Sequence, residues 1–178
     1  MSQAVLDVIK GRRCIREFAN EPVSEKLVRG LLDAARYAPS AGNRQAWFFY
    51  VVKSQAVKAK LAKAALGQSF LKDAPINIVV CAEPDTSASR YGSRGAELYC
   101  LQDTAAAVQN ILLSAHGFGL AACWVGAFDE NAVKNALDMA QNRRPVAIIP
   151  VGYTGLETPP EAPARREIDS ISKIVNDK

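Results

Sequence analysis

Apolar residues return along this chain with the two periods that mark helices and strands. In residues 25–37 they recur every three or four positions, which predicts an amphipathic helix that Pro39 closes. Short runs of aromatic, β-branched and other apolar residues predict strands at 47–52, 76–81, 120–125 and 146–151. Further helices are expected over 3–10, from Ser54 to Gly67, and over 97–116 and 129–139.

These elements predict an α+β fold, because the strands do not alternate with helices regularly enough for a doubly wound sheet. One domain over residues 1–178 is expected from the length. The 97–116 helix is apolar nearly all round, so it belongs at the centre of the domain or at a subunit interface. The polar segment 83–97 is expected to be a surface loop or short helix.

Composition narrows the classes of protein. Apolar residues make up 49% and charged residues 22% of the chain, which excludes wholesale disorder. The net charge of +4 is too small to indicate nucleic-acid binding. No stretch predicts a membrane span or a secretion signal, so a cytoplasmic protein is expected. Four scattered cysteines and a single histidine leave a metal site almost without ligands.

Three arginines within five residues are the first candidate site. Arg12, Arg13 and Arg16 surround Cys14 just after the first predicted helix, and their fixed charges suit a phosphate or a delocalised anion. A solvated basic turn explains the same residues equally well. In the tail, Arg165 and Arg166 are either part of a solvated linker or a second clamp on that anion.

Other motifs are weaker. The uncharged polar groups of residues 39–45 could bind a heterocycle, although ordinary turn chemistry explains them as well. The string from Gly117 to Ala122 matches G-x-G-x-x-A, but it ends a helix and opens a strand, which is the wrong context for a Rossmann site. A catalytic dyad of Cys14 and His116 lacks an orienting motif.

Taken together, the segments resemble the nitroreductase family of FMN-dependent oxidoreductases over nearly the whole chain. The resemblance lies in the order of five motifs: Arg12-Arg13-Cys14-Ile15-Arg16-Glu17-Phe18, Ala38-Pro39-Ser40-Ala41-Gly42-Asn43-Arg44-Gln45-Ala46-Trp47, Asp73-Ala74-Pro75, Gly119-Leu120-Ala121-Ala122-Cys123-Trp124-Val125-Gly126 and Arg165-Arg166. It implies a central, mostly antiparallel sheet flanked by helices, and an obligate-type homodimer whose two subunits both contribute to each site.

The resemblance also implies roles for residues. Residues expected to bind FMN are Arg12, Arg13, Cys14, Arg16, Pro39, Ser40, Asn43, Gln68, Val125, Gly126, Arg165 and Arg166. Arg16 at the N1/O2 edge of the flavin ring and the Gly126 backbone near N5 are the expected catalytic groups, and no metal is expected. The implied reaction takes hydride from NADH or NADPH and reduces a nitroaromatic, a quinone or a similar small-molecule acceptor in ping-pong fashion.

The chain departs from the family pattern at three positions. Cys14 stands where serine is usual, Ala46 where proline is common, and Ala164 where longer relatives carry a second basic residue. Two other functions stay open at this point. One is a flavin-binding or storage module without efficient turnover, and the other is an RNA- or nucleotide-binding protein, which lacks the expected basic stripe interleaved with aromatic residues.

Overall fold

The computed structural model describes residues 3–176, so the ends of the expected 1–178 domain lie outside the described residues. Four strands form one sheet in the order β1-β2-β4-β3, and every neighbouring pair is antiparallel. The strands are β1 (Trp47–Val52), β2 (Ile76–Ala82), β3 (Ala121–Ala122) and β4 (Arg144–Gly152). An antiparallel sheet flanked by helices, as the sequence predicts, is therefore confirmed.

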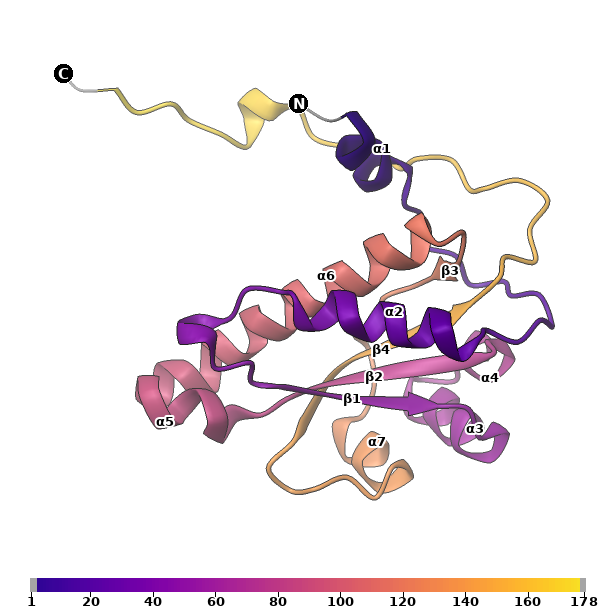
Figure 1. Ribbon diagram of the computed structural model, residues 1–178, viewed down its shortest axis with the longest axis horizontal. Coiled ribbons are helices and arrows are strands. Elements are labelled where there is room, and N and C mark those ends of the chain that lie inside the picture. Colours follow the sequence, from indigo (N-terminus) through magenta and orange to yellow (C-terminus); the bar gives the residue numbers. More distant parts are fainter. Residues whose placement is uncertain (1–2, 177–178) are drawn as a thin grey trace.

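Helices cover both faces of this sheet (Figure 1). The described helices are α1 (Gln3–Gly11), α2 (Glu25–Arg36), α3 (Gln55–Ala64), α4 (Phe70–Asp73), α5 (Pro84–Arg94), α6 (Cys100–Gly117) and α7 (Glu130–Ala136), with short helical turns η1 (Ala41–Asn43), η2 (Gly95–Tyr99) and η3 (Ile168–Ser170). Helices α2 and α6 pack on one face, and α3 and α7 pack on the other, so the domain has three layers.

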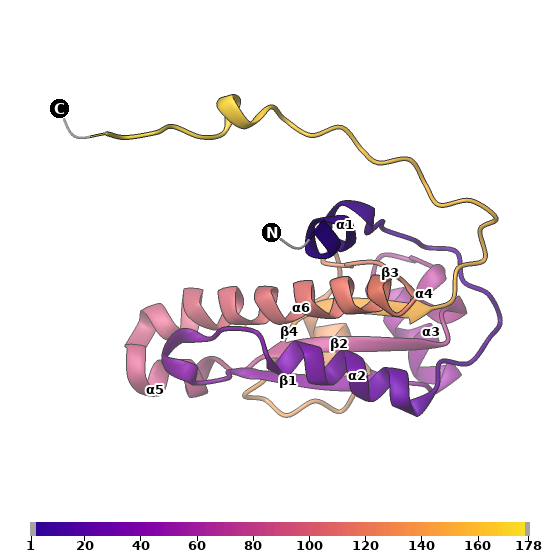
Figure 2. The same cartoon turned by 45° about the horizontal axis from the view of Figure 1, so that its top comes forward.

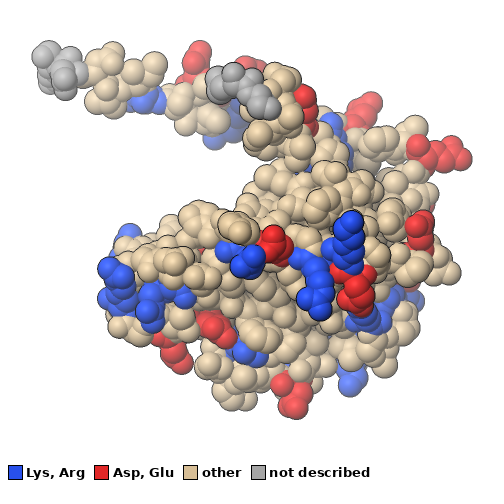
Figure 3. Space-filling model, viewed as in Figure 1, with Lys and Arg blue, Asp and Glu red and all other residues tan. Residues whose placement is uncertain are grey.

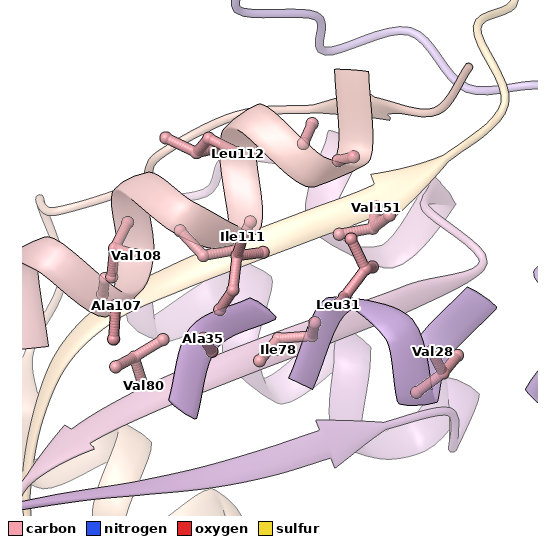
Figure 4. Close-up of a cluster of buried hydrophobic side chains, with 14 of the residues drawn as sticks. Val28, Leu31, Ala35, Ile78, Val80, Ala107, Val108, Ile111, Leu112 and Val151 are labelled. Atoms are coloured by element: carbon pink, nitrogen blue, oxygen red, sulfur yellow. The ribbon is translucent and has the colours of Figure 1, made fainter. Parts of the chain in front are cut away.

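The alternation of side chains along β2 explains why helices pack on both faces of the sheet. All seven residues of β2 are buried. Ile78 and Val80 contact the α2 and α6 layer, where they pack with Leu31 and Ile111 (Figure 4). The residues between them, Val79 and Cys81, join the opposite cluster with α3 and α7. The central helix α6 is thus placed in the core, at the position expected from its apolar sequence.

The polar segment 83–97, expected to be a surface loop or short helix, forms helix α5 with Pro84 in its first turn. The helix is broken at Gly92, where φ is 56°, before the chain enters η2. One strand differs from the expectation. The strand expected at 120–125 is reduced to Ala121–Ala122, because the chain leaves the sheet edge and returns to it only at a bridge between Val125 and Ile148.

The C-terminal tail leaves the body of the domain after Gly155. Every residue from 157 to 176 is exposed, and the tail runs past α1 and away from the sheet (Figure 2). Between residues 3 and 176, no helix is both long and apolar enough to cross a membrane.

Candidate functional site

The arginine segment that follows α1 lies beside strand β3. The Ile15 backbone N–H donates to the Ala122 carbonyl at 3.1 Å, and the neighbouring Cys14 thiol meets the Cys123 thiol and the backbone N–H of Trp124. These contacts place Cys14 and Ile15 directly against residues 122–124. Two motifs that are far apart in the sequence therefore form one edge of the molecule.

The two thiols of this edge have opposite acid–base properties. The Cys123 thiol donates a hydrogen bond to Cys14, and together with the charges of Arg16 and Arg12 this lowers the pKa of Cys14 to about 6. The same hydrogen bond, together with burial, raises the pKa of Cys123. These surroundings therefore favour the thiolate at Cys14 and the protonated thiol at Cys123.

The guanidinium groups of this edge are not neutralised by acids. Among residues 3–176, no ion pair joins Arg12, Arg13 or Arg16 to a carboxylate. The Arg16 guanidinium lies 5.8 Å from the centre of the Phe70 ring and contacts the Cys123 thiol. Fixed positive charge without acidic partners fits an anionic ligand such as a phosphate.

Arg13 has a different role from its two neighbours. Its guanidinium donates to the carbonyls of Lys10, Gly11 and Arg12, and to Pro160 of the tail at 3.1 Å. These contacts tie the end of α1 to the beginning of the tail. Arg13 therefore positions the segment that carries Arg12 and Arg16, with its own donors already directed at carbonyl groups.

Gln68, Val125 and Gly126 lie at the same edge. Val125 is buried and exchanges two backbone hydrogen bonds with Ile148, at 3.0 and 2.9 Å. The Gln68 side chain donates to the Ala127 carbonyl at 3.3 Å. Gly126, between these two anchored positions, is exposed. The expected contact of a flavin with the Gly126 backbone is sterically open.

The loop with Pro39, Ser40 and Asn43 lies elsewhere. The Ser40 hydroxyl accepts a hydrogen bond from the Gln45 backbone N–H at 3.0 Å, which closes the turn, and Asn43 has a positive φ of 55°. The Ala41 backbone N–H donates to the buried carboxylate of Asp103 on α6 at 3.0 Å. Asp103 thereby holds the loop near the first turn of α6.

Within one chain, this loop and the arginines lie at opposite ends of α6. Arg12 and Arg13 share a cavity of about 270 Å³ with Leu112 and His116, near the last turn of that helix. Asp103 and His116 are separated by about 20 Å along the axis, at 1.5 Å per residue. The structure therefore does not bring Pro39, Ser40 and Asn43 to the arginine segment of the same chain.

The tail arginines, Arg165 and Arg166, make no hydrogen bond to the arginine segment at residues 12–16 within the described residues 3–176. Arg166 donates to the Ser170 carbonyl at 2.8 Å, and Arg165 donates to the Pro163 carbonyl at 3.0 Å, so both bind residues of the tail itself.

Three further residues of the site were missed by sequence reasoning: Phe70, Asp103 and Cys123. Only Asp103 could have been noticed in the sequence, because it is an acidic residue within an otherwise apolar helix.

Known proteins resemble this chain in sequence and in fold. The model of the nitroreductase family matches residues 9–69 and 64–153. A relative from Methanothermobacter thermautotrophicus, provisionally named NADH dehydrogenase/NAD(P)H nitroreductase, is 33% identical over 96% of this chain and 85% of its own. A solved nitroreductase family protein from Clostridium difficile superposes with a TM-score of 0.81 at 29% identity, over 94% of this chain and 96% of its own. Another, from Clostridium novyi, reaches 0.77 at 32% identity, over 84% of each chain. The chain belongs to the nitroreductase family.

Proposed function

We propose that this NAD(P)H oxidoreductase of the nitroreductase type uses bound FMN to reduce nitroaromatics, quinones or similar small molecules by a ping-pong mechanism. The observation that carries the proposal is the pair Arg12 and Arg16, which belong to the segment bonded to Ala122 and form no ion pair with a carboxylate of residues 3–176. Relatives named for NADH dehydrogenase and NAD(P)H nitroreductase activity support the choice of electron donor.

Each residue of the edge has a task in this proposal. Arg12 neutralises the phosphate with Arg166, helped by Arg165, while Arg13 holds the segment in place. Arg16 lies at the N1/O2 edge of the ring, where its fixed charge stabilises the negative charge that arrives with a hydride. FMN held by these residues would supply the redox chemistry, hydride acceptance from the nucleotide and electron donation to the second substrate. Cys14 and Gln68 line the ribityl chain, and Val125 and Gly126 present backbone groups to the N5 side.

The remaining part of each site is proposed to come from a second copy of the chain. Pro39, Ser40 and Asn43 of the partner subunit would line the other side of the ring, because one chain holds this loop at the far end of α6. Helix α1 supports a homodimer. None of its residues is buried, and Val5, Leu6 and Ile9 are 62%, 40% and 47% exposed. An amphipathic helix of nine residues needs a packing partner to be stable in water.

Helix α5 is proposed to border the entry of the substrates. It lies next to the 39–45 loop, where Arg44 donates to the Thr86 carbonyl and to the Ser89 hydroxyl. Arg90 and Arg94 stack on Tyr91 and Tyr99, at 5.5 and 5.3 Å from the ring centres. Figure 3 shows basic side chains gathered at this end of the molecule. They offer binding partners for a phosphate of the nicotinamide nucleotide or for an anionic acceptor.

Absorption spectra of the purified protein test the proposal directly. A flavin spectrum that is bleached by NADH or NADPH without oxygen, and restored by an added quinone or nitroaromatic, is the expected result. A flavin that neither nucleotide reduces would instead favour the storage module. A colourless protein that binds no FMN on titration would contradict both the oxidoreductase and the storage module. It would favour a nucleotide- or RNA-binding role.

A further inference from the structure

The thiols of Cys14 and Cys123 are already in contact. The hydrogen bond from Ile15 to Ala122 pairs their two backbone segments, and the Cys123 thiol donates to the Cys14 sulfur. Cys14 directly precedes the donor of this backbone bond and Cys123 directly follows its acceptor, so the two backbones lie side by side, and a disulfide joins Cα atoms about 4.4–6.8 Å apart. A bond between the two sulfur atoms therefore requires little movement of the backbone.

The two cysteines also differ in the way that a reactive pair requires. Cys14 is exposed, and the charges of Arg16 and Arg12 favour its thiolate, which is the nucleophilic form of the side chain. Cys123 is buried behind it and keeps its proton. An oxidant from solvent therefore reaches Cys14 first, and Cys123 is in place to react with the product.

The other two cysteines lack these features. Cys81 is buried in the core, where its nearest sulfur partner is Met139 at 3.7 Å, and burial raises its pKa to about 12. Cys100 is also buried, and its thiol contacts the Ala96 carbonyl at 3.0 Å. Both residues serve as matched internal controls for the reactivity of the first pair.

We propose that Cys14 and Cys123 form an oxidation site that closes to a disulfide on reaction with a hydroperoxide. The Cys14 thiolate attacks one peroxide oxygen, the O–O bond breaks, and the leaving oxygen takes a proton, which gives a sulfenic acid and water or an alcohol. The Cys123 sulfur then attacks the Cys14 sulfur, the S–S bond forms, and the S–O bond breaks. The hydroxide leaves as water with the proton of Cys123. The two sulfurs lose two electrons, and these reduce the peroxide.

Thiol counting and peptide mapping of the full-length protein test this site. After treatment with one equivalent of hydrogen peroxide and trapping with N-ethylmaleimide, the four free thiols should fall to two. A peptide linked through Cys14 and Cys123, which dithiothreitol separates, should appear. The control variant Cys81→Ala should lose two thiols and yield the same linked peptide. Cys123→Ser should form no such peptide, and dimedone should label its Cys14 as the sulfenic acid.

Because the proposed function places Cys14 along the ribityl chain, peroxide is added both before and after FMN is removed from the protein. The linked peptide is expected in the FMN-free protein whether or not the flavin turns over, so failure of one proposal is distinguishable from failure of the other. Four thiols that survive peroxide in the wild-type protein would overturn the proposal. Sulfinic acid at Cys14, or a disulfide between Cys14 residues of two chains, in the absence of the Cys14–Cys123 peptide would also overturn it. Because the decisive peptide map is made on the wild-type chain, the conclusion does not depend on the folding of a variant.

Discussion

Arg16 is the residue whose position is expected to determine the rate of flavin reduction. Its guanidinium lies over the Phe70 ring and against the Cys123 thiol, so its position is set from two sides. We expect Arg16→Ala to keep FMN but to reduce it about 10²-fold more slowly, since the negative charge on the ring loses its fixed partner. Anaerobic stopped-flow reduction by NADH or NADPH measures this rate.

Two further variants sharpen that measurement. Arg16→Lys, which keeps the charge and loses the planar fork, should recover part of the rate. Arg29→Ala removes an exposed arginine of α2 and should leave the rate unchanged. Single-turnover reduction as fast in Arg16→Ala as in wild type would contradict the role given to Arg16.

The Cys14 thiol couples stability to pH with a defined sign. Its pKa is lowered from 9.0 to about 6 in the folded chain, first by the hydrogen bond from Cys123 and then by Arg16 and Arg12. The folded state therefore favours the thiolate. Its contribution to the free energy of unfolding is complete above pH 9.0, decreases as pH falls, and is lost below about 6.

Urea unfolding under reducing conditions measures this contribution. The difference in unfolding free energy between wild type and Cys14→Ser should grow in favour of wild type from about pH 5 to about pH 9. In the same range, alkylation of Cys14 by iodoacetamide should reach half its maximal rate near pH 6, as follows from its pKa of about 6. A difference in stability that does not change with pH would count against the lowered pKa.

At the scale of elements, Asp103 connects α6 to the loop with Ser40 and Asn43. Its carboxylate is 6% exposed, and burial raises its pKa. Asp103→Ala leaves the Ala41 N–H without its acceptor, and we expect a loss of about 1–3 kcal/mol in unfolding free energy, together with weaker FMN binding. Asp103→Asn keeps an acceptor oxygen and removes the buried charge, so it should be at least as stable as wild type at neutral pH. Urea unfolding and FMN titration measure both effects, and equal losses in the two variants would contradict this account.

Elements with one clear period were predictable from the sequence. Helix α2 and strand β1 agree with the prediction to within one residue, because their apolar stripes match the faces that they bury. For residues 83–97 a loop and a short helix both stayed open, since α5 has few apolar residues and its packing depends on small ones. Ser87 is fully buried, and a Cβ at Gly95 would lie 2.6 Å from the Ser87 carbonyl oxygen. The pattern of apolar and polar residues along the sequence does not predict such tight contacts between small residues.

The candidate site likewise has residues that the sequence identified and contacts that it did not. The arginines and the polar loop were identified from residue types and their order along the chain. The contacts of Asp103 with Ala41 and of Cys14 with Cys123 were not, because each joins residues that are distant in the sequence and only the folded sheet and helix bring them together. The role of Arg13 as an anchor for the tail was missed for the same reason.

At the scale of the molecule, the tail arginines test whether both ends of the chain hold one phosphate. Arg12→Ala and Arg166→Ala should each weaken FMN binding by about 1.5–3 kcal/mol, the free energy of a lost hydrogen bond to a charged group. Fluorescence titration of the apoprotein with FMN measures the dissociation constants. Arg36→Ala is a suitable control, because that arginine pairs with Asp33 on the surface of α2. Wild-type affinity in either tested variant would refute its assignment to the phosphate.

The exposed apolar residues of the tail predict the oligomeric state. Ile168, Ile171 and Ile174 are 74%, 60% and 83% exposed, which an isolated chain would leave in water. Light scattering should give twice the chain mass of 19.2 kDa. Replacing Ile171 and Ile174 together by aspartate should shift the protein towards the monomer. Leu66→Asp, at a site 77% exposed beyond α3, should leave the mass unchanged. A monomeric wild-type protein would refute the homodimer.

The length of α6 has a consequence for genetics. If each flavin is held by the arginines of one chain and the loop of another, two different impaired variants can compensate for each other in a mixed dimer. In a mixed pair of Arg16→Ala and Asp103→Ala chains, one of the two sites would receive both lesions and the other would receive neither. Co-expression of the two impaired alleles should therefore give more activity than either allele gives alone.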